Sequence, residues 1–407
     1  MNIGVNYTPR AGWFHSWLDF DPGAVRADLA AISGLGLDHV RIFPLWTLLQ
    51  PHRGLLRQRA VDQVVEVLDI AHEVGLRVWI DALNGHLSSF EFLPPWVTTW
   101  HRSNLFTDPQ VRAGQRQLLA VLADAAASHP AAAGMGLGNE FSQFAATRHP
   151  DVSPTPRTAV DDWLADLFGV LGQHWPDGEH SHSYDDDLFF DDTHPFAPPH
   201  AVGFGSVTTV HSWVFAKNWG ALTGDQRAYG AFARYLLELA AGWAPDPSRT
   251  LWLQEIGAPA PHISADQAPQ FLRASLTASS DMPGLQGMTW WCSHDVDRGL
   301  LDFPELEYSL GLFGPDGTPK PIARELADLL PSLRTVAADA APRPAVVFDV
   351  ASDFADRSVT GPAGPVFTTW WNLWREGHNP ALVWSGYADD AGLLTARGIS
   401  EVLAAGR

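Results

Sequence analysis

The chain has 407 residues, of which 46% are hydrophobic and 18% are charged, and its formal net charge at pH 7 is -20. Such an acidic chain is unsuited to nucleic acid, whose phosphates demand basic surface, and to an anionic membrane surface. A single cysteine, Cys292, excludes an internal disulfide and a cysteine-based zinc cluster.

Strand-like and helix-like stretches alternate over most of the chain. Strands are predicted at residues 3–7, 39–43 and 76–83, just before Asn139, weakly at 179–183, and at 206–211, 251–254 and 285–291. Helices are predicted at residues 22–35, 61–74, 109–128, 158–175, 226–241, 266–279 and 321–330. Short apolar strands separated by longer helices indicate a parallel sheet covered by helices. Eight such units fit a (β/α)8 barrel better than an open sheet.

The composition changes after Pro331. We predict a barrel over residues 1–332, a linker at 333–342 and a small α/β domain over 343–407. This domain is predicted to contain strands at 345–350 and 381–384 and helices at 368–375 and 399–404. Its apolar stretch 367–371 would be a liability if exposed, so we expect it to support contacts in a homo-oligomer.

The beginning of the chain, MNIGVNYTPR, lacks the basic stretch and apolar run of a signal peptide. No window approaches the ~20 apolar residues of a membrane-spanning helix. We therefore expect a soluble, cytoplasmic protein.

Polar and aromatic residues follow most of the predicted strands, and in a (β/α)8 barrel the chemistry lies at these carboxyl ends. In chain order the candidates are Arg41, Asn84, His86, Asn139, Glu140, His211, Trp213, Glu255, Trp290, Trp291 and Asp295. Glu140 and Glu255 follow apolar strands three units apart, so they would face each other across the mouth of the barrel. A pair of carboxyl groups in this arrangement suits glycoside hydrolysis, with retention or inversion decided by their separation.

Asn139-Glu140 after the fourth strand and Glu255 after the seventh resemble the retaining glycosidases that are built on (β/α)8 barrels. Together with Arg41, His211 and a tryptophan after the eighth strand, the pattern resembles glycoside hydrolase family 5. The stretches VNYTPRAGWFHSWLDFD, LDHVRIFPLW, NGHLSSFEFLPPW and TWWCSHDVD are similar to its subfamily 18. Members of that subfamily resemble β-mannosidases that act on the mannosyl-β-1,4-N-acetylglucosamine core of N-glycans. The resemblance covers roughly residues 1–330.

The resemblance implies a role for several of these residues. Glu140 would be the general acid/base, Glu255 the nucleophile, and Asn139 the partner of the sugar 2-hydroxyl. Arg41 would keep Glu255 ionised, while burial and the charge of Glu255 would keep Glu140 protonated.

The remaining candidates would bind substrate. Strand six of the family usually offers His-x-Tyr, whereas this chain has Trp213 at the tyrosine position, and an indole donates a proton but does not accept one. Of Trp290 and Trp291, we prefer Trp291 as the sugar platform. The function expected from the resemblance is a retaining, exo-acting β-mannosidase on short β-mannosides, with no metal and no cofactor. The alternatives are an endo-β-mannanase, a β-glucanase or β-glucosidase, and an inactive carbohydrate-binding barrel.

Two further stretches need interpretation. The glycines at 134, 136 and 138 do not have the spacing of a dinucleotide-binding loop, and we expect them to allow close packing inside the barrel. The His- and Asp-rich segment 180–194 has three interpretations: a solvated acidic loop, a loop that contacts substrate, or a metal site.

Overall fold

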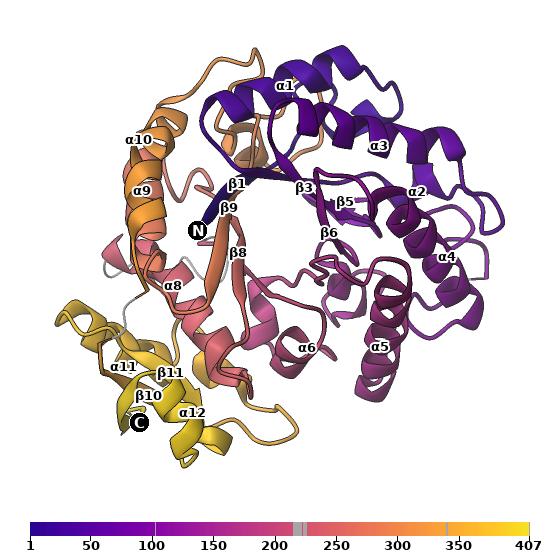
Figure 1. The fold of residues 1–407 in the computed structure, drawn as a ribbon. Coiled ribbons are helices and arrows are strands. Elements are labelled where there is room, and N and C mark those ends of the chain that lie inside the picture. Colours follow the sequence, from indigo (N-terminus) through magenta and orange to yellow (C-terminus); the bar gives the residue numbers. More distant parts are fainter. Residues whose placement is uncertain (102, 215–221, 223–225, 339–340, 407) are drawn as a thin grey trace.

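The computed structural model describes residues 1–101, 103–214, 222, 226–338 and 341–406. Its main feature is a parallel seven-stranded sheet that curls into a ring, with helices on the outside (Figure 1). Around the ring the strands are β6 (Ala132–Gly136), β3 (Arg77–Asp81), β2 (His39–Ile42), β1 (Asn2–Asn6), β9 (Leu285–Trp290), β8 (Leu251–Ile256) and β7 (Thr208–Ser212). All of these neighbours pair in parallel.

The gap between β6 and β7 is filled by the segment where a weak fifth strand was predicted. The Glu179 amide donates to the Ala133 carbonyl at 3.0 Å, and the Ser181 amide donates to the Met135 carbonyl at 3.0 Å. On the other side, the Ser206 amide donates to the His180 carbonyl at 2.8 Å. This segment forms only an isolated bridge, yet it takes the fifth position of the ring. The (β/α)8 prediction is therefore confirmed.

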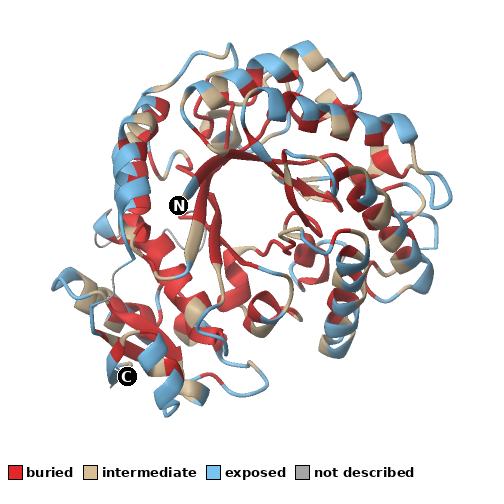
Figure 2. Cartoon of the chain, in the orientation of Figure 1, coloured by how far each residue is buried: buried red, intermediate tan, exposed pale blue. Residues whose placement is uncertain are grey.

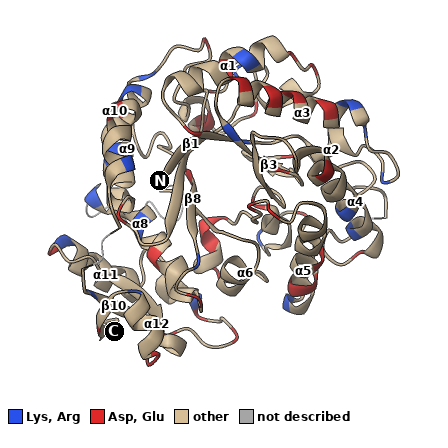
Figure 3. Cartoon of the chain, viewed as in Figure 1, with Lys and Arg blue, Asp and Glu red and all other residues tan. Residues whose placement is uncertain are grey.

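Most of the outer helices bury one face against the sheet and leave the other to solvent (Figure 2). They are α1 (Pro22–Gly34), α3 (Gln58–Glu73), α4 (Pro109–Ala126), α5 (Arg157–His174), α6 (Pro198–Gly203), α8 (Gln226–Trp243), α9 (Ala268–Ser279) and α10 (Pro321–Thr335), with a single-turn helix α2 (Trp46–Leu49). The Asp108 carboxylate caps α4 by accepting from the Gln110 and Val111 amides. Acidic residues are spread over outer helices such as α3 and α5 (Figure 3). Within the described residues, no helix has the length and apolarity needed to cross a bilayer.

A separate parallel sheet of three strands follows the barrel. Its order is β11 (Ala381–Trp384), β10 (Arg343–Phe348) and β12 (Ile399–Ala404), and it is accompanied by α11 (Pro365–Arg375) and α12 (Ala391–Ala396). The predicted helix at 399–404 is wrong, because this stretch is β12 and pairs with β10. Its apolar residues have helical spacing, but pairing with the neighbouring strand overrides that local pattern. The predicted linker includes residues 339–340, which lie outside the described residues.

The apolar stretch 367–371 packs against the barrel of the same chain. The rings of Phe367 and Trp370 lie 4.9 and 5.3 Å from the ring of Tyr235 on α8, and Trp370 is fully buried. The expectation of a homo-oligomer assumed that this apolar stretch would be exposed. Because the contact with the barrel covers much of it, the stretch no longer supports that expectation.

Candidate active site

Glu140 stands just beyond the carboxyl end of β6, in a backbone conformation that few residues adopt. Its φ and ψ are 43° and 32°, in the left-handed region that costs about 1 kcal/mol or more for a residue with a side chain. Glycines allow the close approach that leads to it. A Cβ atom on Gly138 would lie 2.6 Å from the Leu83 carbonyl oxygen, and one on Gly136 would clash with the Asp81 carboxylate. The glycines at 136 and 138 thus serve packing, as expected, and the chain after them presents Glu140.

Arg41 on β2 organises the floor of the barrel mouth. Its Nη1 donates to Glu255 Oε1 at 2.6 Å, and its Nη2 donates to Asn139 Oδ1 at 2.7 Å and to Ser183 Oγ at 2.9 Å. The Nε atom pairs with the carboxylate of Asp81. With only 1% of its side chain exposed, Arg41 fixes Glu255 and Asn139 relative to each other.

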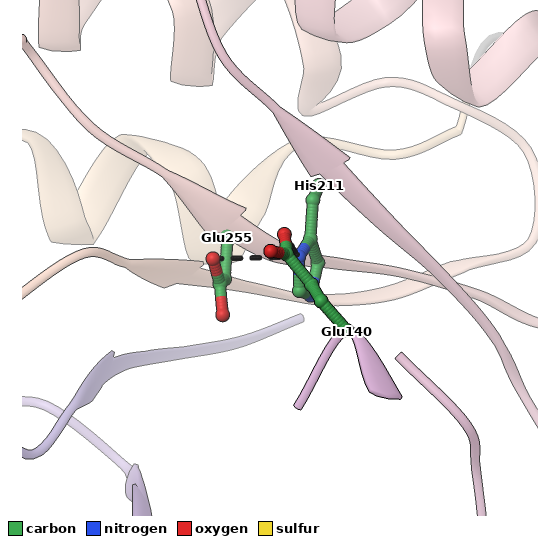
Figure 4. Close-up of side chains that lie close together, drawn as sticks. All are labelled: Glu140, His211 and Glu255. Carbon is green, nitrogen blue, oxygen red and sulfur yellow. Dashed lines mark hydrogen bonds and ion pairs between the residues drawn. The ribbon is translucent and has the colours of Figure 1, made fainter. Parts of the chain in front are cut away.

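Glu140, His211 and Glu255 point toward one another at the mouth (Figure 4). His211 Nδ1 lies 2.7 Å from Glu140 Oε1 and 3.3 Å from Glu255 Oε2. One oxygen of each carboxyl group and one nitrogen of His211 lie within 4.8 Å of one another. Three such groups are also a possible donor set for a metal ion, but here each already has a protein partner, and the Arg41 cation contacts Glu255 directly.

The hydrogen bonds of the site indicate where its protons are. Arg41 only donates, so Ser183 Oγ accepts from it and donates its own hydrogen bond to Gln254 Oε1 at 2.7 Å. The same Gln254 oxygen lies 3.0 Å from His211 Nε2, which must therefore carry a hydrogen. Burial lowers the pKa of His211, so the ring is neutral and its Nδ1 accepts. Because Nδ1 accepts, the partner Glu140 must be the donor and must be protonated.

The surroundings of the two carboxyl groups also favour a protonated Glu140 and an ionised Glu255. Burial raises the pKa of Glu140 well above its usual range, and the charges of Asp185 and Asp187 raise it further. Burial also raises the pKa of Glu255, to about 7, but the charge of Arg41 opposes the rise. Glu140 is thus suited to hold a proton and Glu255 to lose one. The acidic neighbours of Glu140, rather than Glu255, are its main electrostatic partners.

A cavity of about 110 Å³ opens beside the two glutamates. It is lined by His86, Ser88, Ser89, Asn139, Glu140, Trp213, Glu255, Trp291, Leu306 and Glu307. Trp291 packs edge-on against Phe43 and Trp213, with ring centroids 5.6 and 6.4 Å apart. Trp290 is instead buried in the core. The preferred platform, Trp291, is thus the tryptophan of this pair that lies at the cavity.

Five of the predicted substrate-binding residues lie outside the cavity lining: Arg41, Asn84, His211, Trp290 and Asp295. Asn84 Nδ2 donates to the carbonyls of Pro44 at 3.0 Å and Asp81 at 2.6 Å, so it braces the loop after β3. The carboxylate of Asp295 accepts from Lys320 Nζ at 2.7 Å and from the Gly311 amide at 2.8 Å. Both side chains are used in holding loops. A position after a strand places a residue near the mouth, but it does not fix the direction of the side chain.

The segment 180–194 contributes charged neighbours to Glu140. Asp186, Asp187 and His194 are buried, so the interpretation as a solvated loop is wrong. Arg148 forms ion pairs with Asp185, at 3.1 Å, and with Asp187. Burial lowers the pKa of His194 to about 3, so this histidine is neutral.

Sequence reasoning missed part of the cavity wall. Ser88 and Ser89 lie between the short strands β4 (His86–Leu87) and β5 (Phe90–Glu91), and Leu306 and Glu307 lie in a 3-10 turn at Glu305–Ser309. The turn begins 15 residues after the end of β9. No periodicity or strand-end position marks these residues. The presence of a glutamate in the long loop after the eighth strand was the only sequence feature that could have pointed to Glu307.

A (β/α)8 barrel with two facing glutamates, one placed to hold a proton and the other to lose one, defines a glycoside hydrolase. A GH5_18 structure from Streptomyces cattleya, in complex with GlcNAc, is 48% identical over 99% of this chain and 98% of that chain, with a TM-score of 0.97. A GH5_18 variant from Bifidobacterium longum subsp. longum ATCC 55813, in complex with Manβ1-4GlcNAc, is 39% identical over 100% of this chain and 96% of that chain, with a TM-score of 0.96. The chain belongs to glycoside hydrolase family 5, subfamily 18.

A more distant relative supports the assignment of the fold alone. The exo-β-1,4-mannosidase Op5Man5 from Opitutaceae bacterium strain TAV5 is 22% identical over 94% of this chain and 69% of that chain, with a TM-score of 0.79. No family model matches the sequence. No curated protein sequence matches it either.

Proposed function

We propose that the chain is a retaining, exo-acting β-mannosidase that removes one mannose from short β-mannosides such as Manβ1-4GlcNAc. The observation that carries this proposal is the close approach of the two carboxyl groups, with oxygens of Glu140 and Glu255 within 4.8 Å. A spacing of ~5–5.5 Å is typical of retaining enzymes, whereas inverting enzymes need ~6.5–9.5 Å to admit a water.

In the first step Glu255 attacks the anomeric carbon, and Glu140 gives its proton to the glycosidic oxygen as that bond breaks. His211 Nδ1, 2.7 Å from Glu140, orients that proton. In the second step Glu140 is a carboxylate that faces a nitrogen lone pair. This contact favours taking a proton from water, so Glu140 acts as the base while the water oxygen attacks the anomeric carbon. The bond to Glu255 breaks, and Glu255 leaves as a carboxylate.

Asn139 has one amide hydrogen available for the sugar. Its Oδ1 accepts from Arg41 at 2.7 Å, and one hydrogen of Nδ2 is directed to the His86 carbonyl at 3.3 Å. The other Nδ2 hydrogen is free to reach the 2-hydroxyl of a sugar whose anomeric carbon lies between the glutamates. A hydrogen bond to this hydroxyl strengthens as the ring flattens in the transition state.

The size of the cavity favours exo action. Its volume of about 110 Å³ lies well below the ~300–1,000 Å³ of pockets for drug-sized ligands, so it suits one sugar ring rather than a polymer. The choice of mannose and of a GlcNAc leaving group rests on the GH5_18 relatives, whose structures hold GlcNAc and Manβ1-4GlcNAc.

The test is hydrolysis of nitrophenyl β-mannoside beside the β-glucoside, β-galactoside and β-xyloside, with Manβ1-4GlcNAc as the natural-type substrate. We expect turnover of the two mannosides, release of β-mannose first, and loss of at least about 10⁴-fold in kcat for Glu255→Gln. Release of α-mannose would contradict retention. Preference for another sugar would overturn the mannoside assignment, and activity in Glu255→Gln would overturn the nucleophile.

A further inference from the structure

A third carboxyl group lines the cavity beside the two catalytic glutamates. Glu307 comes from the loop between β9 and α10, and it lines the cavity together with Ser88 from the β4–β5 hairpin. The side chains of Ser88 and Trp291 lie close enough to Glu307 to lower its pKa. Glu307 therefore sits where two loops and the tryptophan platform meet.

The electrostatic surroundings of Glu307 differ from those of Glu255. Burial raises the pKa of Glu307 to about 7. Among the described residues, no lysine, arginine or histidine forms an ion pair with Glu307, whereas Arg41 pairs with Glu255. Glu307 is only partly buried, and a carboxylate that is partly removed from water without a cationic partner is unfavourable. The stability of the fold therefore does not explain why a glutamate stands at this position of the cavity wall.

An unsatisfied polar atom accompanies this carboxyl group. His86 Nδ1 is buried and has no hydrogen-bond partner among the described residues. His86 lines the same cavity as Glu307. Buried polar groups normally find partners, so an unpaired nitrogen at the cavity indicates a polar ligand.

The chemistry of the ligand follows from the positions already occupied. With the anomeric carbon between Glu140 and Glu255, and Asn139 at the 2-hydroxyl, a sugar in the cavity still has hydroxyls at C3, C4 and C6. Sugar hydroxyls donate hydrogen bonds, and a carboxylate accepts two of them in a charge-assisted arrangement.

We propose that Glu307 is a substrate-binding residue whose carboxylate accepts hydrogen bonds from hydroxyls at C3, C4 or C6 of the terminal sugar, with Ser88 beside it. This inference rests on the proposed function, because it assumes that a terminal sugar occupies the cavity.

The experiment combines enzyme variants with substrates that lack one hydroxyl. Wild type and Glu307→Gln are compared on nitrophenyl β-mannoside and on its 3-deoxy, 4-deoxy and 6-deoxy analogues. We expect Glu307→Gln to lose about 10–100-fold in kcat/KM on the parent substrate. Removing a hydroxyl that Glu307 binds costs wild type a similar factor but costs Glu307→Gln little more, because both changes delete one interaction.

The matched control is Glu305→Gln, on the same 3-10 turn, whose carboxylate is exposed and pairs with the exposed Arg298. We expect its kcat/KM to stay within about twofold of wild type. Unchanged kcat/KM in Glu307→Gln, or full additivity at all three hydroxyls, would overturn the proposal. If Glu307→Gln does not fold, the wild-type series decides: losses below twofold for every deoxy substrate overturn it.

Failure of the proposed function gives a different result. If the enzyme prefers a β-glucoside, the mannosidase assignment is wrong, and the same deletion series on deoxyglucosides still tests Glu307. If no glycoside is turned over, deoxy sugars are compared as ligands by calorimetry, with mannose as the probe. Equal affinity of wild type and Glu307→Gln for mannose would then overturn the proposal.

Discussion

Two largely buried glutamates in this chain, Glu238 and Glu140, have opposite surroundings. Glu238 lies on α8, where the barrel meets the small sheet, and it is paired with Arg234 at 3.1 Å, with Arg343 and with Arg397 at 3.7 Å. Burial raises the pKa of Glu238, but the three arginines more than offset this, so the net pKa is lowered. Glu140 has two acidic neighbours and a neutral histidine, and its pKa is raised.

The difference separates a group that is matched to the folded state from a group that we propose to perform chemistry. At Glu238 the negative charge is matched by arginines. Two of them, Arg343 on β10 and Arg397 at the end of α12, belong to the small C-terminal unit, so the carboxylate joins that unit to the barrel. At Glu140 the charge is disfavoured and the backbone is strained, and 13% of the side chain remains exposed to the cavity. A strongly raised pKa in a cavity is a feature of functional sites. Removing each carboxylate should therefore have opposite consequences.

The largest expected effect is on activity, from Glu140→Ala. Hydrolysis of Manβ1-4GlcNAc should fall about 10²–10⁴-fold, because the sugar leaving group needs the proton of Glu140. Dinitrophenyl β-mannoside needs no protonation to leave, so its first step should fall far less, and azide should restore turnover by replacing the base-activated water. Steady-state and burst kinetics on the two substrates check this. Equal losses on both substrates would contradict the role of Glu140 as acid.

The stability of a second variant at this position, Glu140→Gln, sharpens the comparison. The folded pKa of Glu140 is raised above its unfolded value of ~4.3, so this group favours the folded state at low pH, and that contribution is lost as pH rises. At neutral pH the carboxyl group therefore costs stability. We expect Glu140→Gln, which keeps the size of the side chain, to unfold at the same or a higher temperature than wild type. A marked decrease in its melting temperature at pH 7 would contradict this sign.

The next effect is on stability, from Glu238→Gln. This change leaves buried arginines without their counter-charge, so we expect the free energy of unfolding to fall by about 3–5 kcal/mol. Because the folded pKa of Glu238 is lowered, its contribution is present at neutral pH and is lost as pH falls through that pKa. The difference from wild type should therefore shrink in acid. Chemical unfolding at several pH values measures it.

Glu325→Gln is the matched control for Glu238→Gln. Glu325 pairs with Arg273 on the surface, and half of the arginine side chain is exposed. We expect its free energy of unfolding to change by less than about 1 kcal/mol. If Glu238→Gln behaves like this control, the cluster is not what holds the small sheet to the barrel.

The placement of Glu140 opposite Glu255 could be predicted from the sequence, and the charge cluster around Glu238 could not. Glu140 and Glu255 follow apolar strands, and the geometry of a barrel brings such positions to one place whatever the details of the loops. Glu238 lies inside a helical stretch whose periodicity predicts a helix and nothing more. Its partners Arg343 and Arg397 are more than 100 residues away in sequence, so only the docking of the small sheet brings them together.

The same limit explains the errors near the site. Asp295 follows the eighth strand as predicted, but Lys320 and Gly311 bind its carboxylate, which sequence position could not indicate. Glu307 lies in an irregular loop, where no period relates sequence to direction. At the C-terminus, β12 has apolar residues at helical spacing, and only its pairing with β10 makes it a strand. Strand ends that converge are predictable, whereas loop contacts depend on the completed fold.

The smallest expected effect, and the finest test of what keeps Glu140 protonated, comes from Gln254→Met. In wild type Gln254 Oε1 holds the hydrogen of His211 on Nε2, so Nδ1 presents a lone pair to Glu140. Without that acceptor the ring is free to place its hydrogen on Nδ1 and donate to the ionised carboxylate. Donation to the charged form lowers the pKa of Glu140. The alkaline limb of kcat/KM should move down by about one pH unit, since one unit is ~1.4 kcal/mol and hydrogen bonds to charged groups are worth ~1.5–3.

A pH profile distinguishes this positioning role from a merely structural one. A general loosening of the site would lower kcat/KM at every pH and leave the shape of the profile unchanged. Ser183→Ala is the matched control, because it removes the other donor to Gln254 Oε1 and leaves the contact with His211 in place. Its alkaline limb should move less than that of Gln254→Met. If both profiles keep the wild-type limb, the burial and acidic neighbours of Glu140 suffice to hold its proton, and the hydrogen-bond chain from Arg41 only orients it.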